Sequence, residues 1–404
     1  MTLVVVGAGL AGAKAAEAAR ATGFAGRVLL VGEEHSPPYE RPPLSKQVLK
    51  GEKPPESARV HPEGFYDEQR IELRTGERVT GLDLADRTVH VGDEVVPYDR
   101  LVLATGARPR RLGIPGADLE GVHYLRTVED SVRLAEAARS AGRVAVVGGG
   151  WIGSEVAASL RQLGADVVVV DPMPTPLHGV LGPEVGASFA QLHKAHGVQL
   201  RMGVGVASLR GSGRVDGVVL ADGSTEAADV VVVGVGALPN TELAEAAGLA
   251  VDNGVVVDER LQTAVPGVLA TGDVASAFHP RYGRHVRVEH WANALNQGAA
   301  AGRNAVGEPE VYDRLPYFYS DQYDLGMEYV GLAGRDDSVT VRGDREGLQF
   351  LAFYHRDGRV TAALTVNVWD VVDDLKAIIT TGWEVDEGVL ADPDIPLNDL
   401  RGGG

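Results

Sequence analysis

The chain has 404 residues, of which 44% are hydrophobic and 23% are charged, a composition typical of a folded globular protein with about three domains. Its formal net charge of −18 argues against nucleic-acid binding, because phosphate binding requires a basic surface. No stretch approaches the roughly 20 apolar residues that cross a bilayer, and residues 3–6 resemble a buried strand. We therefore expect a cytoplasmic protein with no membrane span or targeting segment, ordered except in the tail at 401–404.

The sequence contains no cysteine. This excludes disulfide exchange, thiolate nucleophiles and cysteine-ligated zinc or iron–sulfur clusters held by the chain itself. Any redox chemistry therefore depends on an external cofactor. His193 and His196 lie three residues apart on a predicted helix, but no third ligand is nearby, so we interpret them as solvated helix residues and predict no metal site.

A pattern of strand, glycine turn and helix begins near residue 2 and recurs near residue 143. Each copy has a β-branched run, a glycine motif, an alanine-rich segment and a second apolar run before an acidic residue, which predicts a βαβ unit. The fingerprint residues are Gly7, Gly9, Gly12 and Glu33 in the first copy, and Gly148, Gly150, Gly153 and Asp171 in the second.

Both copies fit the dinucleotide-binding fingerprint G-x-G-x-x-G. In this motif the first glycine permits a tight turn, the second lets a pyrophosphate approach the backbone, and the third lets the helix pack on the strand. One such match is weak evidence, since glycine turns between strands and helices are common. Two complete units in one chain predict two dinucleotide sites.

Further strand-to-glycine segments lie at 101–110, 230–240 and 267–275. Their order predicts an α/β fold with two Rossmann-type domains of the glutathione-reductase-like kind, the second inserted into the first. We expect the first domain at 1–112 and 236–310, and the second at 113–235.

The remaining region, 311–404, is predicted to form an α+β domain. Its segments SVTVRG, LQFLAFYH and RVTAALTVN are typical of successive strands. Asp357–Gly358 is a favoured tight-turn pair between the last two. An amphipathic helix is expected over about 368–381, packed on this sheet.

Several longer motifs resemble one family, the FAD-dependent NAD(P)H:ferredoxin reductases of oxygenase systems, which includes putidaredoxin reductase, rhodocoxin reductase and the biphenyl dioxygenase reductase. The motifs are PYERPPLSK (38–46), LVLATGARPR (101–110), GGGWIGSE (148–155), EHWANALNQG (289–298) and PYFYSDQYDLGMEYVG (316–331). The resemblance covers almost the whole chain. One departure is that the family usually has tryptophan where Tyr317 and Tyr319 stand here, which puts an electron path through an indole in doubt.

By this resemblance the first βαβ unit binds FAD, with Gly7, Gly9, Ala11 and Gly12 at the pyrophosphate and Glu33 at the adenosine ribose. Lys46 is implied near the isoalloxazine, and Trp291 is implied to pack at the flavin. Further implied cofactor-binding residues are Arg41, Val79, Ala104, Thr105, Gly106, Arg126, Gly236, Gly272, Asp273, Glu289 and His290.

The second unit is implied to bind the nicotinamide cofactor through Gly148, Gly150, Ile152 and Gly153. Glu155 resembles the family glutamate beside the nicotinamide and the flavin lysine, so Lys46 and Glu155 are the expected catalytic residues. The alternative for Glu155 is an ordinary helix glutamate favoured by the dipole. Asp171 accepts from a ribose 2′-OH but repels a 2′-phosphate, which predicts NADH over NADPH.

The resemblance implies hydride transfer from NADH to FAD, followed by one-electron transfer to a small acidic [2Fe–2S] ferredoxin that serves a P450 or a dioxygenase. The absence of cysteine is consistent with direct export of electrons from the flavin. Two alternatives stay open: a reductase of small acceptors such as quinones or ascorbate radical, and a redox-gated interaction protein like apoptosis-inducing factor. Either a monomer or a homodimer is compatible with the sequence.

Overall fold

The computed structural model describes residues 1–401, so most of the tail for which disorder is expected lies outside the described residues. The chain divides into two compact units, which are described separately. The first unit comprises residues 1–42, 55–108 and 237–314, and the second comprises 43–54, 109–236 and the chain from 315 onwards. The three-domain division stays a prediction. Within residues 1–401, every helix is too short or too polar to cross a bilayer.

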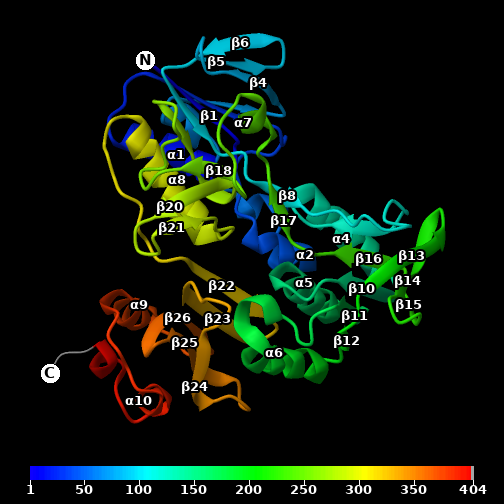
Figure 1. Ribbon diagram of the computed structural model, residues 1–404. Helices are drawn as coiled ribbons and strands as arrows, with labels where there is room; N and C mark the ends of the chain where they lie inside the picture. Colours follow the sequence, from blue (N-terminus) through cyan, green and yellow to red (C-terminus); the bar gives the residue numbers. More distant parts are fainter. Residues whose placement is uncertain (402–404) are drawn as a thin grey trace. The chain divides into compact units, whose positions relative to one another are not determined.

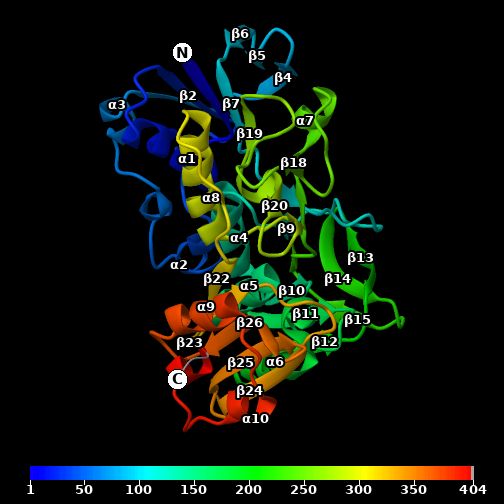
Figure 2. The same ribbon diagram turned by 60° about the vertical axis from the view of Figure 1, so that its left-hand side comes forward.

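A five-stranded parallel sheet forms the centre of the first unit. Its strand order is β19 (Val268–Ala270), β7 (Arg100–Leu103), β1 (Thr2–Val6), β2 (Arg27–Gly32) and β3 (Ile71–Thr75). Figure 1 labels its strand β1, and Figure 2 labels β2, β7 and β19. Strands β1, β2 and β7 consist mainly of buried valine and leucine, which suit a parallel sheet covered on both faces. The central strand β1 leads into α1 (Leu10–Ala21), so the first glycine turn lies at the carboxyl end of the sheet, where such folds bind ligands.

Helix α8 (Trp291–Ala305) packs tightly on α1, and both views show the two helices side by side (Figures 1 and 2). Two glycines of α8 make this possible. A Cβ atom added at Gly298 would lie 2.4 Å from the carbonyl oxygen of Ala11, and one at Gly302 would lie 2.1 Å from that of Ala15. Real Cβ atoms do not approach this closely, so the helices meet backbone to backbone.

We expect Gly298→Ala to lower the melting temperature, because the added methyl group forces the two helices apart at a cost of about 1–3 kcal/mol. Gly179 offers a matched control, since it also lies in a helix but an added Cβ would meet nothing within 4 Å. Gly179→Ala should leave stability unchanged or raise it by up to about 1 kcal/mol. Equal melting temperatures for the two variants would contradict the close packing of α1 and α8.

Smaller elements complete the first unit. They are η2 (Pro55–Ala58), α3 (Phe65–Glu68), β4 (Val79–Asp83), β5 (Thr88–Val91), β6 (Glu94–Pro97), α7 (Glu242–Ala246), β18 (Val255–Val257), η3 (Gly272–Val274), β20 (Ala275–His279) and β21 (Arg284–Val286). Strands β4, β5 and β6 form one three-stranded sheet, and β18, β20 and β21 form another. The short strands β8 (Ala107–Pro109) and β17 (Ala237–Pro239) pair with each other.

The second unit contains another five-stranded parallel sheet. Its order is β12 (Gln199–Met202), β11 (Asp166–Asp171), β10 (Arg143–Val147), β16 (Val230–Val233) and β9 (Val122–Tyr124). The helices of this Rossmann-like part are α4 (Val128–Ser140), α5 (Trp151–Gln162) and α6 (His178–Ala195), and a three-stranded sheet adds β13 (Val206–Ser212), β14 (Arg214–Leu220) and β15 (Thr225–Ala227). Central strand β10 leads into α5, so the second glycine turn repeats the position of the first.

The C-terminal part contains an antiparallel sheet and helices, which agrees with the predicted α+β structure. Its order is β22 (Tyr317–Gln322), β23 (Leu325–Gly331), β26 (Arg359–Val366), β25 (Gln349–Arg356) and β24 (Ser338–Asp344). Asp357 and Gly358 both have positive φ, +50° and +73°, as the predicted tight turn requires. The predicted helix is α9 (Val372–Thr381), which starts four residues late because Asp370 has φ +62°. Short helices α2 (Gln47–Lys50) and α10 (Glu387–Ala391), with η1 (Pro42–Ser45) and η4 (Leu397–Arg401), complete the chain.

Both faces of the C-terminal sheet are buried. One face packs on α9, which contributes Leu375, Ile378 and Ile379 to a shared core. The other face packs on α6 through Leu181 and Phe189. The parallel and antiparallel parts of this unit therefore share a core, and β22 is held against α5.

Candidate dinucleotide sites and a buried ion pair

The first glycine turn has the geometry expected of a pyrophosphate-binding loop. Gly7 has φ +110°, and an added Cβ would lie 2.1 Å from the carbonyl oxygen of Ala104. At Gly12 an added Cβ would lie 1.9 Å from the Gly7 carbonyl oxygen. At Gly9 an added Cβ would meet nothing within 4 Å, so this glycine faces open space. The three glycines thus serve the turn, the close helix packing and the approach of a ligand.

The start of α1 offers unpaired amide groups to an anion. Gly9 is the N-cap residue and provides no side-chain cap, and the first turn contains no acidic residue. Ala11 lies in this turn, and Gly272 approaches it so closely that a Cβ there would lie 2.8 Å from the Ala11 Cβ. The free N–H groups and the helix dipole favour a phosphate at this position.

The second glycine turn repeats these features. Gly148 has φ +105°, and an added Cβ would lie 2.4 Å from the Gly234 carbonyl oxygen; the corresponding distance from Gly153 to the Gly148 oxygen is 1.9 Å. Gly150 faces open space and caps α5 without a side chain. Ile152, in the first turn of α5, is 43% exposed. This turn can therefore also accept a pyrophosphate.

An acidic residue lies at the end of the second strand of each βαβ unit, but the two residues differ in their contacts. Asp171 ends β11, and its carboxylate accepts hydrogen bonds from the backbone N–H groups of Gly149, at 2.6 Å, and Met173, at 2.7 Å. It is therefore fixed beside the glycine turn. Glu33 is exposed and lies 3.5 Å from the Arg78 guanidinium.

Several other expected FAD-binding residues meet near the carboxyl ends of β7 and β19. Ala104, Thr105 and Gly106 follow β7, and the Thr105 hydroxyl donates to the Asn240 carbonyl oxygen at 2.7 Å. The backbone N–H of Gly272 donates to Oε1 of Gln297 at 2.8 Å. The Thr271 hydroxyl is fully buried and has no protein partner among residues 1–401. An unpaired buried hydroxyl fits a polar ligand at this edge.

Charged residues also gather in this part of the first unit. Burial lowers the pKa of Arg41, but Tyr39, Glu34 and Asp273 together outweigh burial and raise it above the ordinary value. Arg41 pairs with Glu34 at 2.7 Å. Burial lowers the pKa of His290 to about 4, against the opposing effect of Asp273. His290 is thus a neutral imidazole at pH 7.

The remaining expected cofactor residues are placed as follows. Val79 begins β4 and is half-buried, Glu289 pairs with Arg287, and Trp291 is the first residue of α8. Arg126 and Gly236 belong to the second unit, where Arg126 precedes α4 and Gly236 follows β16 with φ +101°.

A buried ion pair joins Lys46 and Glu155 in the second unit. Lys46 Nζ lies 2.8 Å from Glu155 Oε2, and each side chain is 7% exposed. The Ser45 hydroxyl donates to Oε2 at 2.5 Å, and the Ser320 hydroxyl donates to Oε1 at 2.7 Å. The Lys46 ammonium also lies 5.8 Å from the centre of the Tyr319 ring.

The surroundings of Glu155 differ from those of the ordinary helix glutamate considered from the sequence. Glu155 lies beyond the first turn of α5, which holds no acidic residue, so the helix N-terminus does not explain it. Desolvating two charges is costly, and a buried ion pair is weak evidence of a purely structural role. Buried charges held by several partners are typical of functional sites.

The interpretation of His193 as a solvated residue is wrong. It lies on α6 as predicted, but it is 1% exposed because the β22–β23 turn covers this side of the helix. Its Nδ1 lies 3.1 Å from the Tyr323 hydroxyl oxygen. His196, the C-cap residue, is half-buried, with its ring stacked on Tyr323 at 3.7 Å.

Burial lowers the pKa of His193 to about 4, with Gln322 opposing and His196 adding to this shift. An unfolded chain protonates histidine below about pH 6.5. Between about pH 6.5 and 4 the unfolded state therefore binds more protons than the folded state, and the free energy of unfolding falls as the pH is lowered. We expect a loss of about 2 kcal/mol from this residue at pH 5. His193→Gln should therefore flatten the fall in melting temperature between pH 7.5 and 5, whereas His285→Gln, at an exposed position, should not.

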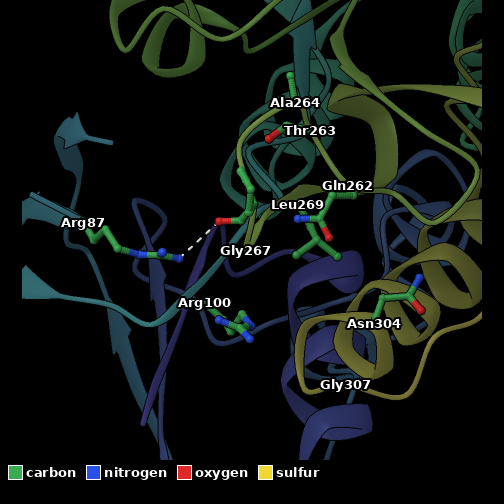
Figure 3. A pocket seen from close by; sticks show the side chains of 10 residues that line it. Arg87, Arg100, Gln262, Thr263, Ala264, Gly267, Leu269, Asn304 and Gly307 are labelled. Atoms are coloured by element: carbon green, nitrogen blue, oxygen red, sulfur yellow. Dashed lines mark hydrogen bonds between the residues drawn. The ribbon is translucent and has the colours of Figure 1, made fainter. Parts of the chain in front are cut away.

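A surface pocket of about 380 Å³ lies in the first unit, where strands β7 and β19 begin (Figure 3). Its lining includes Arg87, Arg100 and Asn304. Arg100 is the first residue of β7, so the pocket lies at the amino ends of the strands. The first glycine turn lies at the other end of the sheet. Arg87 donates to the Asp99 and Pro266 carbonyl oxygens, at 2.9 and 3.2 Å, which stabilises the loop before β19. We assign this pocket no part in dinucleotide binding.

Comparison with known proteins also identifies a dinucleotide-dependent oxidoreductase. Residues 1–298 match the family described as pyridine nucleotide-disulphide oxidoreductase, and residues 317–401 match the reductase C-terminal family. The anthranilate 1,2-dioxygenase system ferredoxin–NAD(+) reductase component of Burkholderia cepacia is 42% identical over 98% of both chains. Putidaredoxin reductase of Pseudomonas putida is 38% identical over 98% of this chain and 96% of its own.

Solved structures are similar over nearly the whole chain. A ferredoxin reductase from Rhodopseudomonas palustris superposes with a TM-score of 0.95 and 37% identity, covering 99% of this chain and 100% of that one. The covalent putidaredoxin reductase–putidaredoxin complex gives the same TM-score and identity, with 99% and 97% covered.

The fold and the two glycine turns define an oxidoreductase that uses FAD and a nicotinamide dinucleotide, and the chain belongs to the pyridine nucleotide-disulphide oxidoreductases. Within that class it is a member of the ferredoxin–NAD(+) reductases of oxygenase systems, as the motifs predicted. The disulphide of the class name has no counterpart here, since the chain has no cysteine.

Sequence reasoning missed the two serines at Glu155. Ser45 adjoins Lys46, so the PYERPPLSK motif could have indicated it. Ser320 lies 165 residues from Glu155, and no local pattern marks it as a partner.

Proposed function

We propose that the chain is an NADH:ferredoxin reductase that passes electrons from NADH through FAD to a [2Fe–2S] ferredoxin serving a P450 or a dioxygenase. One observation carries the proposal: two dinucleotide-binding turns occur in a chain without cysteine. A disulfide relay is therefore impossible, and electrons must leave directly from the cofactor. Relatives named as ferredoxin–NAD(+) reductase components, and a putidaredoxin reductase solved with putidaredoxin, support a ferredoxin as the acceptor.

Each part of the chain has a role in this proposal. FAD and NADH, when bound, supply hydride transfer followed by one-electron release. The turn at Gly7–Gly12 binds the FAD pyrophosphate, and the turn at Gly148–Gly153 binds that of NADH. Lys46 and Glu155 present a fixed pair of opposite charges that orients the nicotinamide end, because orientation of the reacting rings governs the rate of hydride transfer.

Asp171 carries the proposed preference for NADH. Its carboxylate is held by two backbone N–H groups beside the glycine turn, where the adenosine ribose of a dinucleotide would lie. We expect NADH to exceed NADPH by at least tenfold in kcat/KM. Asp171→Asn keeps an acceptor oxygen but removes the negative charge. It should therefore raise kcat/KM for NADPH and lower the ratio of kcat/KM for NADH to that for NADPH roughly tenfold. Wild-type preference for NADPH would contradict the assignment.

The decisive experiment supplies NADH to the flavin-loaded protein and measures cytochrome c reduction with and without ferredoxins from the same source. Strong stimulation by one ferredoxin, with a rate that changes between low and high salt, is the expected result. Turnover as fast with ferricyanide or quinones alone would favour a reductase of small acceptors. A long-lived charge-transfer complex with dimerisation on NADH addition would favour a redox-gated interaction protein.

A further inference from the structure

A line of buried polar groups runs from Glu155 through the C-terminal sheet to α6. The Glu155 carboxylate accepts from the Ser320 hydroxyl at 2.7 Å, and Nε2 of Gln322 donates to the Ser320 oxygen at 3.4 Å. At the other end, Tyr323 and His193 are joined at 3.1 Å. Ser320, Gln322 and His193 are each 1% exposed. Such groups are placed in a protein interior only at a cost, so their continuity needs an explanation.

The first two residues of the line share a face of β22. Ser320 and Gln322 lie two positions apart, so both point into the core on the same side as Phe318, where β22 packs against α5 and shares a buried cluster with α6. Tyr323 follows with φ +59°, a left-handed conformation that turns its side chain back toward α6. The fold therefore brings residues of three distant segments into one row.

The remaining gap in the row is between His193 and Gln322. Nε2 of His193 and Oε1 of Gln322 are both buried and have no protein hydrogen-bond partner in the described part of the chain. Gln322 directly precedes Tyr323, whose hydroxyl lies 3.1 Å from His193 Nδ1, so the chain brings both residues to the same histidine, and Gln322 acts to raise the pKa of that histidine. One is a potential donor and the other an acceptor, and each is the natural partner of the other.

Pairing of His193 Nε2 with Gln322 Oε1 would close the row, and the carboxylate would then fix the direction of each of its hydrogen bonds. A carboxylate only accepts, so the single hydroxyl hydrogen of Ser320 must point to Glu155. Gln322 must then present its NH₂ group to Ser320 and its oxygen to His193. His193 must carry its proton on Nε2, and its bare Nδ1 must accept from the Tyr323 hydroxyl. Exchanging the donor and acceptor roles of any one of these side chains would break a hydrogen bond of the row.

We propose that His193 is a positioning residue that holds Glu155 against Lys46 through Gln322 and Ser320, with Tyr323 fixing its tautomer. This inference deepens the proposed function, because it rests on the role of Glu155 at the nicotinamide end. His193 touches no cofactor in this scheme. It acts by orienting Gln322, which orients Ser320, which orients the carboxylate.

The tautomer of His193 gives a test that does not depend on turnover. Nitrogen NMR of the flavin-loaded protein with labelled histidine should show His193 as a single form protonated on Nε2. Ser320→Ala breaks the row two residues away and should produce a mixture of tautomers or an altered Nε2 signal. His196, outside the row, should keep its signal in both proteins. An unchanged His193 signal in Ser320→Ala, or the Nδ1–H form in the wild type, would overturn the proposal.

A kinetic test uses Tyr323→Phe, which removes only the hydroxyl at the far end of the row. Reduction of the flavin by NADH should slow roughly tenfold, about 1.4 kcal/mol of transition-state stabilisation. Tyr354→Phe is the matched control, because it also removes a buried hydroxyl on this sheet, one that donates to the Leu181 carbonyl oxygen at 2.9 Å. The control should change the rate less than about twofold.

The row predicts non-additive effects, which a packing role does not. In a Glu155→Gln variant the side chain at 155 can donate as well as accept, so it no longer fixes the direction of the hydrogen bonds in the row. Adding Tyr323→Phe to this variant should therefore change the rate of flavin reduction less than about twofold. Additive tenfold losses would overturn the proposal. Because these measurements stop at flavin reduction, they stand even if no ferredoxin accepts electrons, and failure of the acceptor screen would count against the proposed function alone.

Discussion

Gly9→Asp should fold into a protein that is at least as stable as the wild type without FAD but is unable to retain FAD. Gly9 is the N-cap of α1, has φ −83° and faces open space, so an aspartate fits without strain. Its carboxylate would cap the unpaired N–H groups of the first turn, which contributes a few tenths of a kcal/mol relative to the glycine N-cap. The same carboxylate would occupy the position of the pyrophosphate and repel it.

Gly150→Asp is the corresponding change in the second turn. Gly150 also caps its helix in open space, with φ −75°. We expect this variant to retain FAD but to lose reduction by NADH by about 100-fold or more, since the first turn is unaffected. Flavin content after gel filtration and stopped-flow reduction by NADH measure the two effects separately.

Asparagine variants separate charge from capping. Gly9→Asn caps the helix equally well but brings no negative charge, so it should retain clearly more FAD than Gly9→Asp. Loss of FAD from the Gly150 variant with retention in the Gly9 variant would reverse the assignment of the two turns. Equal retention by all variants would show that neither turn binds the pyrophosphate.

The glycine turns could be predicted because their requirements are local. Gly7 needs a positive φ and Gly12 contacts the carbonyl oxygen of Gly7, five residues before it, and the spacing of the motif records both requirements. Only the contact of Gly7 with Ala104 depends on a distant part of the chain. The strands around them could be predicted for a similar reason, since a strand buried on both faces is a continuous apolar run. The Asp357–Gly358 turn is another local feature, and it was found at the predicted place.

The cluster around Glu155 could not be derived from local pattern. Ser45, Glu155 and Ser320 come from the 3-10 helix η1, the helix α5 and the strand β22, separated by more than 100 residues, and a serine in a strand has no distinctive sequence signal. Only the resemblance indicated Lys46 and Glu155, and it did not indicate the serines.

His193 shows why a polar helix residue can mislead. Lys194 beside it is exposed, and a helical pattern alone does not say which side a later part of the chain will cover. The covering element is the turn at Tyr323, 130 residues further on. The misinterpretation therefore came from a tertiary contact that periodicity does not encode.

Lys46→Met should give the largest loss of stability among single changes in the second unit. It leaves the Glu155 carboxylate buried with two serine hydroxyls but no opposite charge. Breaking a buried pair in this way typically costs about 3–5 kcal/mol, so we expect the melting temperature of the flavin-loaded protein to fall by roughly 5–10 °C. Flavin reduction by NADH should slow by roughly 100-fold, because the oriented charges are lost.

The double variant Lys46→Met/Glu155→Gln separates the two effects. Without a buried charge, its melting temperature should return to within about 3 °C of the wild type, since neutral replacement of a buried pair is often harmless to stability. Flavin reduction should stay slow, because stability and orientation depend on different properties of the pair. Recovery of both would mean that Lys46 and Glu155 serve the fold alone, whereas an unchanged melting temperature in Lys46→Met would mean that the pair is not desolvated.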